Sequence, residues 1–216
     1  MESFKLSNLI IWPCCSEKIG IKRTILNGKN IERFLDGPSI EKLHEGRKEN
    51  LEIIEKKGLA ALDLYTGHLY SVFDFKNAVR GAVESKTHCL ILSAGYGLIR
   101  AEEPIDLYNK SMNQALESWT RHNLIADVFS QYLKVNKISN AFITASKTTY
   151  APALFYQGSI DPRFIMPELC EAFVYIPIPP RDSSPIREVP KMQGEAIRDL
   201  IHNEFIPDSR WIRIKS

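Results

Sequence analysis

The residue types best suited to chemistry stand at the ends of three apolar segments of the chain. They are Cys14, Ser16 and Lys18 after the first segment, Ser93, Gly95, Tyr96, Gly97 and Arg100 at and after the second, and Ser146, Lys147 and Tyr150 after the third. A turn with free backbone N–H groups and a lysine can hold an anion. Tyrosine rings can stack on a base or sugar. These residues predict a pocket for a nucleotide-like ligand.

The second segment, His88–Ile99, is the centre of this prediction. Its uncharged residues from Cys89 to Ser93 are typical of a strand that is buried on both faces. Gly95 and Gly97 allow positive φ and leave space for a ligand against the backbone. We therefore expect Tyr96, which these glycines flank, to lie in the pocket rather than in the core. The alternative interpretation is a glycine-rich turn without a ligand.

Charged and nucleophilic side chains near these segments suggest specific roles. We expect Lys18 and Arg100 to supply the positive charge that holds an anionic ligand. Cys14 or Cys15 is a candidate nucleophile if Lys18 lowers the pKa of its thiol. Asp106 could stabilise a developing oxocarbenium ion during glycosidic-bond cleavage. The competing interpretations are a solvated turn around Lys18 and tyrosines that belong to the core.

Strand and helix patterns alternate along the chain and would position these residues. Apolar strand candidates lie at 9–12, 89–93, 141–145 and 173–177, and helical patterns at 31–57, 72–84, 113–135 and 189–201. The alternation predicts an α/β fold with a mostly parallel central sheet flanked by helices. We expect a single domain over residues 1–216, in which residues 30–57 are a possible helical insertion. Parallel strands would bring the three polar loops to one edge of the sheet.

Composition limits the function classes. The chain has 216 residues, a hydrophobic fraction of 44% and a net charge of +2, so its overall charge is not that of a typical nucleic-acid binder. The first residues do not resemble a signal peptide, and no apolar run approaches membrane-spanning length. A cytoplasmic location is expected.

The five histidines have no recognised metal-ligand spacing, so we expect no metal and no cofactor. The oligomeric state stays open.

Three motifs resemble those of the peroxide-stress YaaA-like proteins and their relatives. They are Tyr65-Thr66-Gly67-x-x-Tyr70, then Leu92-Ser93-Ala94-Gly95-Tyr96-Gly97-Leu98-Ile99-Arg100, then Asp106-Leu107-Tyr108 with Met112. The family pattern for the second motif is L-S-G-L-Y-G-L-L-R-P, and here its first glycine is shifted by one residue. The loops at 13–18 and 144–150 are similar to family loops at strand ends.

The resemblance implies a mixed α/β fold with a helical insertion, and an association with DNA binding and oxidative stress. It adds Thr66, Gly67 and Tyr108 to the ligand-binding candidates, which already include Tyr65, because its ring could line a cleft and stack on a base or sugar.

Three hypotheses follow from the residues and the resemblance together. The first is a nucleic-acid-associated protein that binds DNA or recognises a base or nucleotide in the pocket. The second is an enzyme acting on a nucleotide or nucleobase, such as a glycosidic-bond hydrolase or transferase. The third is a non-catalytic interaction domain.

Overall fold

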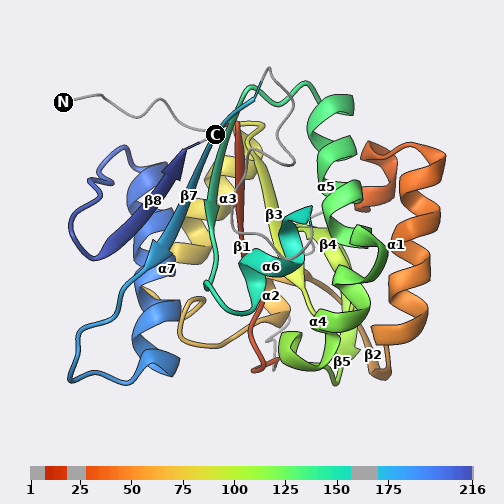
Figure 1. Ribbon diagram of the computed structural model, residues 1–216, viewed down its shortest axis with the longest axis horizontal. Helices are drawn as coiled ribbons and strands as arrows, with labels where there is room; N and C mark the ends of the chain where they lie inside the picture. Colours follow the sequence, from red (N-terminus) through yellow and green to blue (C-terminus); the bar gives the residue numbers. More distant parts are fainter. Residues whose placement is uncertain (1–7, 19–27, 157–169, 216) are drawn as a thin grey trace.

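A six-stranded mixed sheet forms the centre of the fold (Figure 1). The computed structural model describes residues 8–18, 28–156 and 170–215. The strand order is β4-β3-β1-β6-β7-β8. Strands β1 (Leu9–Pro13), β3 (His88–Ser93), β6 (Asn140–Thr144) and β7 (Glu171–Pro177) are parallel, whereas β4 (Gly97–Arg100) and β8 (Trp211–Lys215) pair antiparallel at the edges. The predicted α/β class with a mostly parallel sheet is therefore confirmed.

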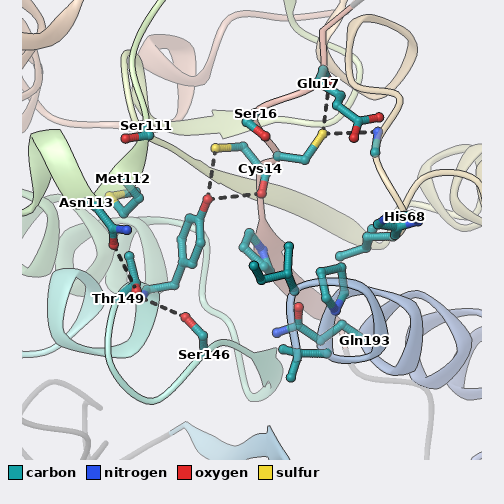
Figure 2. A pocket seen from close by; sticks show the side chains of 18 of the residues that line it. Cys14, Ser16, Glu17, His68, Ser111, Met112, Asn113, Ser146, Thr149 and Gln193 are labelled. Atoms are coloured by element: carbon teal, nitrogen blue, oxygen red, sulfur yellow. Dashed lines mark hydrogen bonds between the residues drawn. The ribbon is translucent and has the colours of Figure 1, made fainter. Parts of the chain in front are cut away.

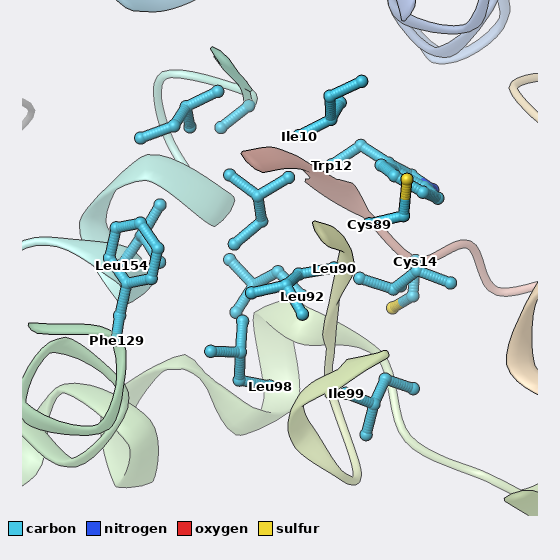
Figure 3. Packing of buried hydrophobic residues seen from close by; sticks show 14 of the residues in the cluster. Ile10, Trp12, Cys14, Cys89, Leu90, Leu92, Leu98, Ile99, Phe129 and Leu154 are labelled. Carbon is cyan, nitrogen blue, oxygen red and sulfur yellow. The ribbon is translucent and has the colours of Figure 1, made fainter. Parts of the chain in front are cut away.

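The central strands are apolar because helices cover both faces of the sheet. All five residues of β1 are buried, so the strand shows no alternation of polar and apolar residues. Leu90, Leu92 and Leu98 belong to the same core cluster as Phe129 and Leu154 (Figure 3). Cys14 also belongs to this cluster, where the core meets the end of β1.

Two groups of helices flank the sheet on opposite sides (Figure 1). Helices α3 (Phe75–Glu84) and α7 (Pro185–Ile201) pack against each other and against β3 and β7, respectively. On the other side lie α1 (Gly37–Asn50), α4 (Met112–Thr120), α5 (Leu124–Val135) and α6 (Tyr150–Leu154). Shorter turns are η1 (Ile31–Phe34), α2 (Ala61–Leu64) and η2 (Arg121–Asn123).

The strand order reverses its direction beside β1. The chain passes from β1 to its neighbour β3 on one side, and later enters β6 on the other side of β1. In open α/β sheets such a reversal leaves a crevice at the carboxyl ends of the strands, where ligands bind. The loops after β1 and β6 start at this point.

The segment at residues 30–57 is helical only in part. Asp36 caps α1, because its side chain accepts a hydrogen bond from the Ser39 backbone N–H (3.0 Å). The predicted helix to residue 57 is wrong, since α1 ends at Asn50. Residues Ile53–Ala60 form β2, which pairs antiparallel with β5 (Pro104–Tyr108) in a separate two-stranded sheet. The sequence of residues 51–57 has a helical period, but most of this segment forms a strand because β5 supplies hydrogen-bonding partners for its backbone.

Two other sequence predictions need correction. The helix predicted over 113–135 is interrupted, because His122 and Asn123 adopt positive φ between α4 and α5. The strand at 173–177 is not the last one, since β8 pairs with β7. In the parts of the chain that the structure describes, none of the helices combines the length and apolar character needed to cross a bilayer.

Candidate functional site

A pocket of about 520 Å³ lies at the carboxyl-terminal edge of the sheet, at the strand-order reversal (Figure 2). Its walls come from the loop after β1, the turn at 67–69, the start of α4, the loop after β6 and the first half of α7. The volume falls within the range of about 300–1,000 Å³ that is usual for small-molecule sites. The structure thus has a cavity of ligand size where the topology predicts one.

The loop after β1 brings two thiols to the pocket. The Cys14 backbone N–H donates to the Leu92 carbonyl (2.9 Å), which extends the β1–β3 pairing by one residue. The Cys15 thiol donates to the Glu17 carbonyl (3.0 Å) and accepts from the Gly67 N–H (3.3 Å). Burial raises the pKa of Cys15 to about 11, so this thiol is protonated at neutral pH. Cys15 therefore holds two walls of the pocket together and is a poor nucleophile.

A buried cluster of hydroxyl groups lies beneath Cys14. The Tyr65 hydroxyl bonds to those of Ser93 (3.1 Å) and Tyr108 (2.9 Å). The Tyr108 hydroxyl donates to the Cys14 Sγ (3.7 Å), and the Tyr150 hydroxyl lies 3.4 Å from the same sulfur. Burial raises the pKa of all three tyrosines, so their hydroxyls are neutral. This hydroxyl cluster connects the end of β3 to the pocket floor through Cys14.

The loop after β6 forms the facing wall with α4. The Ser146 side chain accepts a hydrogen bond from the Tyr150 backbone N–H (3.3 Å) at the start of α6. The Thr149 hydroxyl donates to the Asn113 side-chain oxygen (3.2 Å), which ties the loop to α4. Met112 adds an apolar surface beside Asn113 (Figure 2). This wall offers polar groups for the edge of a ligand and an apolar group for its face.

Helix α7 closes the pocket on the opposite side. Its contribution is mainly apolar: Pro185, Ile186, Val189 and Pro190, together with the amide of Gln193. Gly194 allows α7 to approach the turn after Gly67, because a Cβ at this position would lie 2.5 Å from the Leu69 carbonyl oxygen. The pocket width therefore depends on a close helix–turn contact.

The second polar segment does not line the pocket, contrary to the sequence prediction. Residues Ser93–Gly97 form the tight turn of the β3–β4 hairpin, in which the Ser93 hydroxyl accepts from the Tyr96 N–H (3.1 Å). A Cβ at Gly95 would lie 2.6 Å from the Tyr108 ring. Gly97 has φ of +73° and faces the Trp119 ring. Both glycines permit close side-chain packing and not ligand approach.

Tyr96 is a core residue. It is 8% exposed, its ring packs edge-on against Tyr108, and its hydroxyl accepts from the Asp106 backbone N–H (2.9 Å). Its carbonyl accepts from Arg47 on α1 (3.0 Å). The expectation that Tyr96 lies in the pocket is wrong, because α1 and β5 cover the hairpin turn.

The two cations expected to hold an anion are engaged elsewhere. Arg100 is buried, forms an ion pair with Glu102 and donates to the Tyr132 hydroxyl (2.9 Å). The Lys18 ammonium lies 4.1 Å from the centre of the Tyr108 ring and donates to the Ser16 carbonyl (3.4 Å), and burial lowers its pKa. Arg100 lies outside the pocket walls, and Lys18 is adjacent to them but covered.

Asp106 does not line the pocket with Cys14. Its carboxylate accepts from the backbone N–H groups of Lys57 (2.8 Å) and Gly58 (2.9 Å), and so stabilises the bulge in β2. The two residues predicted as catalytic, Cys14 and Asp106, therefore do not lie in one site. Lys147 is exposed in the loop after β6 without lining the cavity. The Thr66 backbone N–H donates to the Glu17 carbonyl (3.1 Å), which holds the turn before Gly67.

Five of the residues predicted from sequence come together as pocket walls: Cys14, Ser16, Gly67, Ser146 and Tyr150. Tyr65, Ser93 and Tyr108 support them from below through the hydroxyl cluster. Cys15 and Thr149 lie in the loops that the sequence predicted at the site, whereas sequence reasoning missed several other wall residues, among them His68, Lys110, Asn113 and Gln193. Met112 was detectable from the third motif, whereas Gln193 gave no signal, because it lies within an ordinary amphipathic helix.

Among the described residues, no group of three or more His, Cys, Asp or Glu side chains is arranged to hold a metal ion. Within the described ranges, the pocket walls contain one carboxylate, Glu17, and one lysine, Lys110. Its donor and acceptor groups are thus mainly hydroxyl, amide and thiol groups.

A family model described as peroxide stress protein YaaA matches residues 24–157, which is more than half of the chain. Searches of curated proteins and of solved structures gave no significant match. The matched range includes the hydroxyl-bearing motifs around Tyr65, Ser93 and Tyr108, and the pocket walls at 110–113 and 146–150. On this evidence the chain belongs to the peroxide stress protein YaaA family.

Proposed function

We propose that this YaaA-family protein recognises a nucleobase or nucleotide, either free or within an unpaired nucleic-acid strand, in the pocket at the carboxyl edge of the sheet. The observation that carries the proposal is the convergence of the loops after β1 and β6 on one cavity of about 520 Å³ at the strand-order reversal. Doubly wound sheets bind nucleotides at this place.

The chemistry of the walls supports a planar ligand with a polar edge. Met112, Val189 and Pro190 offer apolar surface, as the faces of a base require. Ser16 and Ser146 bring hydroxyl groups that can pair with base edges or a phosphate. A binding site for a base combines these two features.

The sparse positive charge favours recognition of one nucleotide over tracking along a strand. Lys110 lines the pocket, and Lys147 stands in an adjoining loop. Two lysines suit one or two phosphates, so log Kd for a short single strand should change with log salt with a slope of about one to two.

The test is calorimetric titration with the four nucleoside 5′-monophosphates and a short single-stranded oligonucleotide. Ser146→Ala should weaken binding roughly fivefold, since one hydrogen bond contributes about 1 kcal/mol. Ser139→Ala is the matched control, because Ser139 precedes the opposite end of β6. Its binding should equal that of the parent. Absence of binding by the parent to every probe would refute the proposal.

The enzyme hypothesis has weaker support from the geometry. Cys14 reaches the pocket, but Asp106 is used by the β2 backbone, and Glu17 is the carboxylate among the described walls. Binding is therefore the function that the arrangement favours.

A further inference from the structure

Gln193 is an unusual member of the pocket wall. It lies on the buried side of α7 with Ala196, Ile197 and Leu200, and its side chain is 1% exposed. Its amide nitrogen is buried and has no hydrogen-bond partner among the residues that the structure describes. Gln193 nevertheless lines the cavity (Figure 2).

A buried amide nitrogen without a partner destabilises the folded state, because the group loses its hydrogen bonds to water. A methionine or leucine would fill a similar volume without this cost. Most buried polar groups in folded proteins are paired, so an exception suggests a role that the protein alone does not satisfy. Its place in the wall of the cavity points to a ligand.

The position of Gln193 is fixed by the packing around it. The neighbouring residue, Gly194, allows α7 to contact the Leu69 backbone, since a Cβ there would lie 2.5 Å from the Leu69 oxygen. The Cys15 thiol anchors the same turn through the Gly67 N–H (3.3 Å). The amide is therefore held on a helix whose distance from the facing wall is set by backbone contacts.

We propose that Gln193 is a specificity-determining residue that donates a hydrogen bond to a carbonyl oxygen of the ligand. This inference rests on the proposed function and narrows it to bases with a carbonyl oxygen at C6 of a purine or C4 of a pyrimidine, which are guanine and uracil or thymine; adenine and cytosine carry an amino group at that position. Adenine presents an exocyclic amino group where guanine presents a carbonyl oxygen, so it would leave the amide nitrogen unpaired. Residues 185–193 lie outside the range matched by the family model.

The experiment compares the affinities of GMP, UMP, AMP and CMP for the parent, Gln193→Met and Gln193→Glu. The parent should prefer GMP or UMP. Gln193→Met should weaken binding of the preferred ligand about tenfold, with AMP and CMP nearly unchanged. Gln193→Glu replaces a donor with an acceptor and should shift the preference toward AMP or CMP. Gln131→Met, on α5 away from the pocket, is the control and should behave as the parent does.

Thermal unfolding separates recognition from folding. Gln193→Met removes an unpaired buried group, so its midpoint should equal or exceed that of the parent. Equal affinity of the parent for all four nucleotides, or an unchanged preference in folded Gln193→Met, would overturn the inference and leave the proposed function intact. Failure of the parent to bind any of the four nucleotides would overturn both.

Discussion

Single side chains in this protein divide into those that face the pocket and those that hold its walls. The positions of the tyrosines, in the pocket or in the core, were the hardest to predict from the sequence. Tyr150 reaches the cavity, whereas Tyr65 and Tyr108 are buried beneath it and joined through hydroxyl groups 2.9 Å apart. Tyr96 supports the hairpin turn. Residue type alone predicts that a tyrosine can stack, but the fold decides whether a ligand can reach the ring.

Tyr96→Ala tests this division. The change removes a ring that is 8% exposed, so it should lower the free energy of unfolding by roughly 3–5 kcal/mol. Nucleotide affinity, measured at a temperature where the variant is folded, should stay near that of the parent. Tyr96→Phe is the control, since it removes one hydrogen bond and should cost about 1 kcal/mol. A Tyr96→Ala variant that is as stable as the parent but binds nucleotide more weakly would show that Tyr96 lies in the pocket.

Glu103 predicts a pH dependence of stability. Its carboxylate accepts from the backbone N–H groups of Ile31 (2.9 Å) and Arg100 (3.2 Å), and burial raises its pKa from 4.5 to about 7. Between these two values the folded state holds a proton that the unfolded state has released. Stability contributed by this group is therefore present at low pH and lost as pH rises toward 7.

Glu103→Gln removes this titration and keeps an acceptor. Its stability relative to the parent should rise by roughly 3 kcal/mol between about pH 5 and about pH 8, since one pKa unit corresponds to about 1.4 kcal/mol. Urea unfolding across this range measures the difference. A constant difference would show that Glu103 titrates normally.

At the level of elements, periodicity predicted the buried strands well and the exposed edges poorly. Strands β1, β3 and β6 lie at the positions expected, and all their residues are buried except the first residue of β3 and of β6. Strands β2 and β5 were missed, because the first six residues of β2 are exposed and its register is interrupted by bulges. The break before α5 was also missed, since it depends on positive φ at His122 and Asn123. Pairing partners and local backbone reversals are not encoded in the period of a single segment.

In the candidate site, too, the sequence predicted the parts that depend on a single segment and not those that depend on contacts between distant segments. The loops after β1 and β6 were predicted, because each follows a recognisable strand. The wall formed by α7 was not predicted, since its approach depends on Gly194 and the Leu69 backbone, far apart in sequence.

Helix α7 sets the pocket width, and Gly194→Ala tests this. The added methyl group would lie 2.5 Å from a backbone oxygen, so the helix must shift. We expect a loss of about 1–3 kcal/mol in stability, as for overpacking of a core, together with weaker nucleotide binding. Gly81→Ala in α3 is a matched control, because nothing lies within 4 Å of its Cβ position. It should stabilise the protein by roughly 0.5–1 kcal/mol. Equal effects of the two substitutions would contradict the close contact.

At the scale of the whole molecule, the strand order determines where the site lies. Strands β3 and β6 flank β1, and the loops after β1 and β6 bring residues 14–16 and 146–150 together although they are distant in sequence. Helix α7 completes the cavity from beyond the range matched by the YaaA family model. The matched range thus supplies the walls at 67–69, 110–113 and 146–150, and the loop after β1 and helix α7, both outside that range, supply the others.

The most direct test of a nucleotide site at this edge is amide chemical-shift mapping by NMR with GMP as the ligand. The account predicts shift changes that saturate with GMP and concentrate at residues 14–17, 67–69, 110–113, 146–150 and 185–193. Residues at the opposite edge, such as Ser139 and Glu171, should be unaffected. Saturable changes confined to that opposite edge, or to β8, would contradict the account, as would the absence of any change at high GMP concentration.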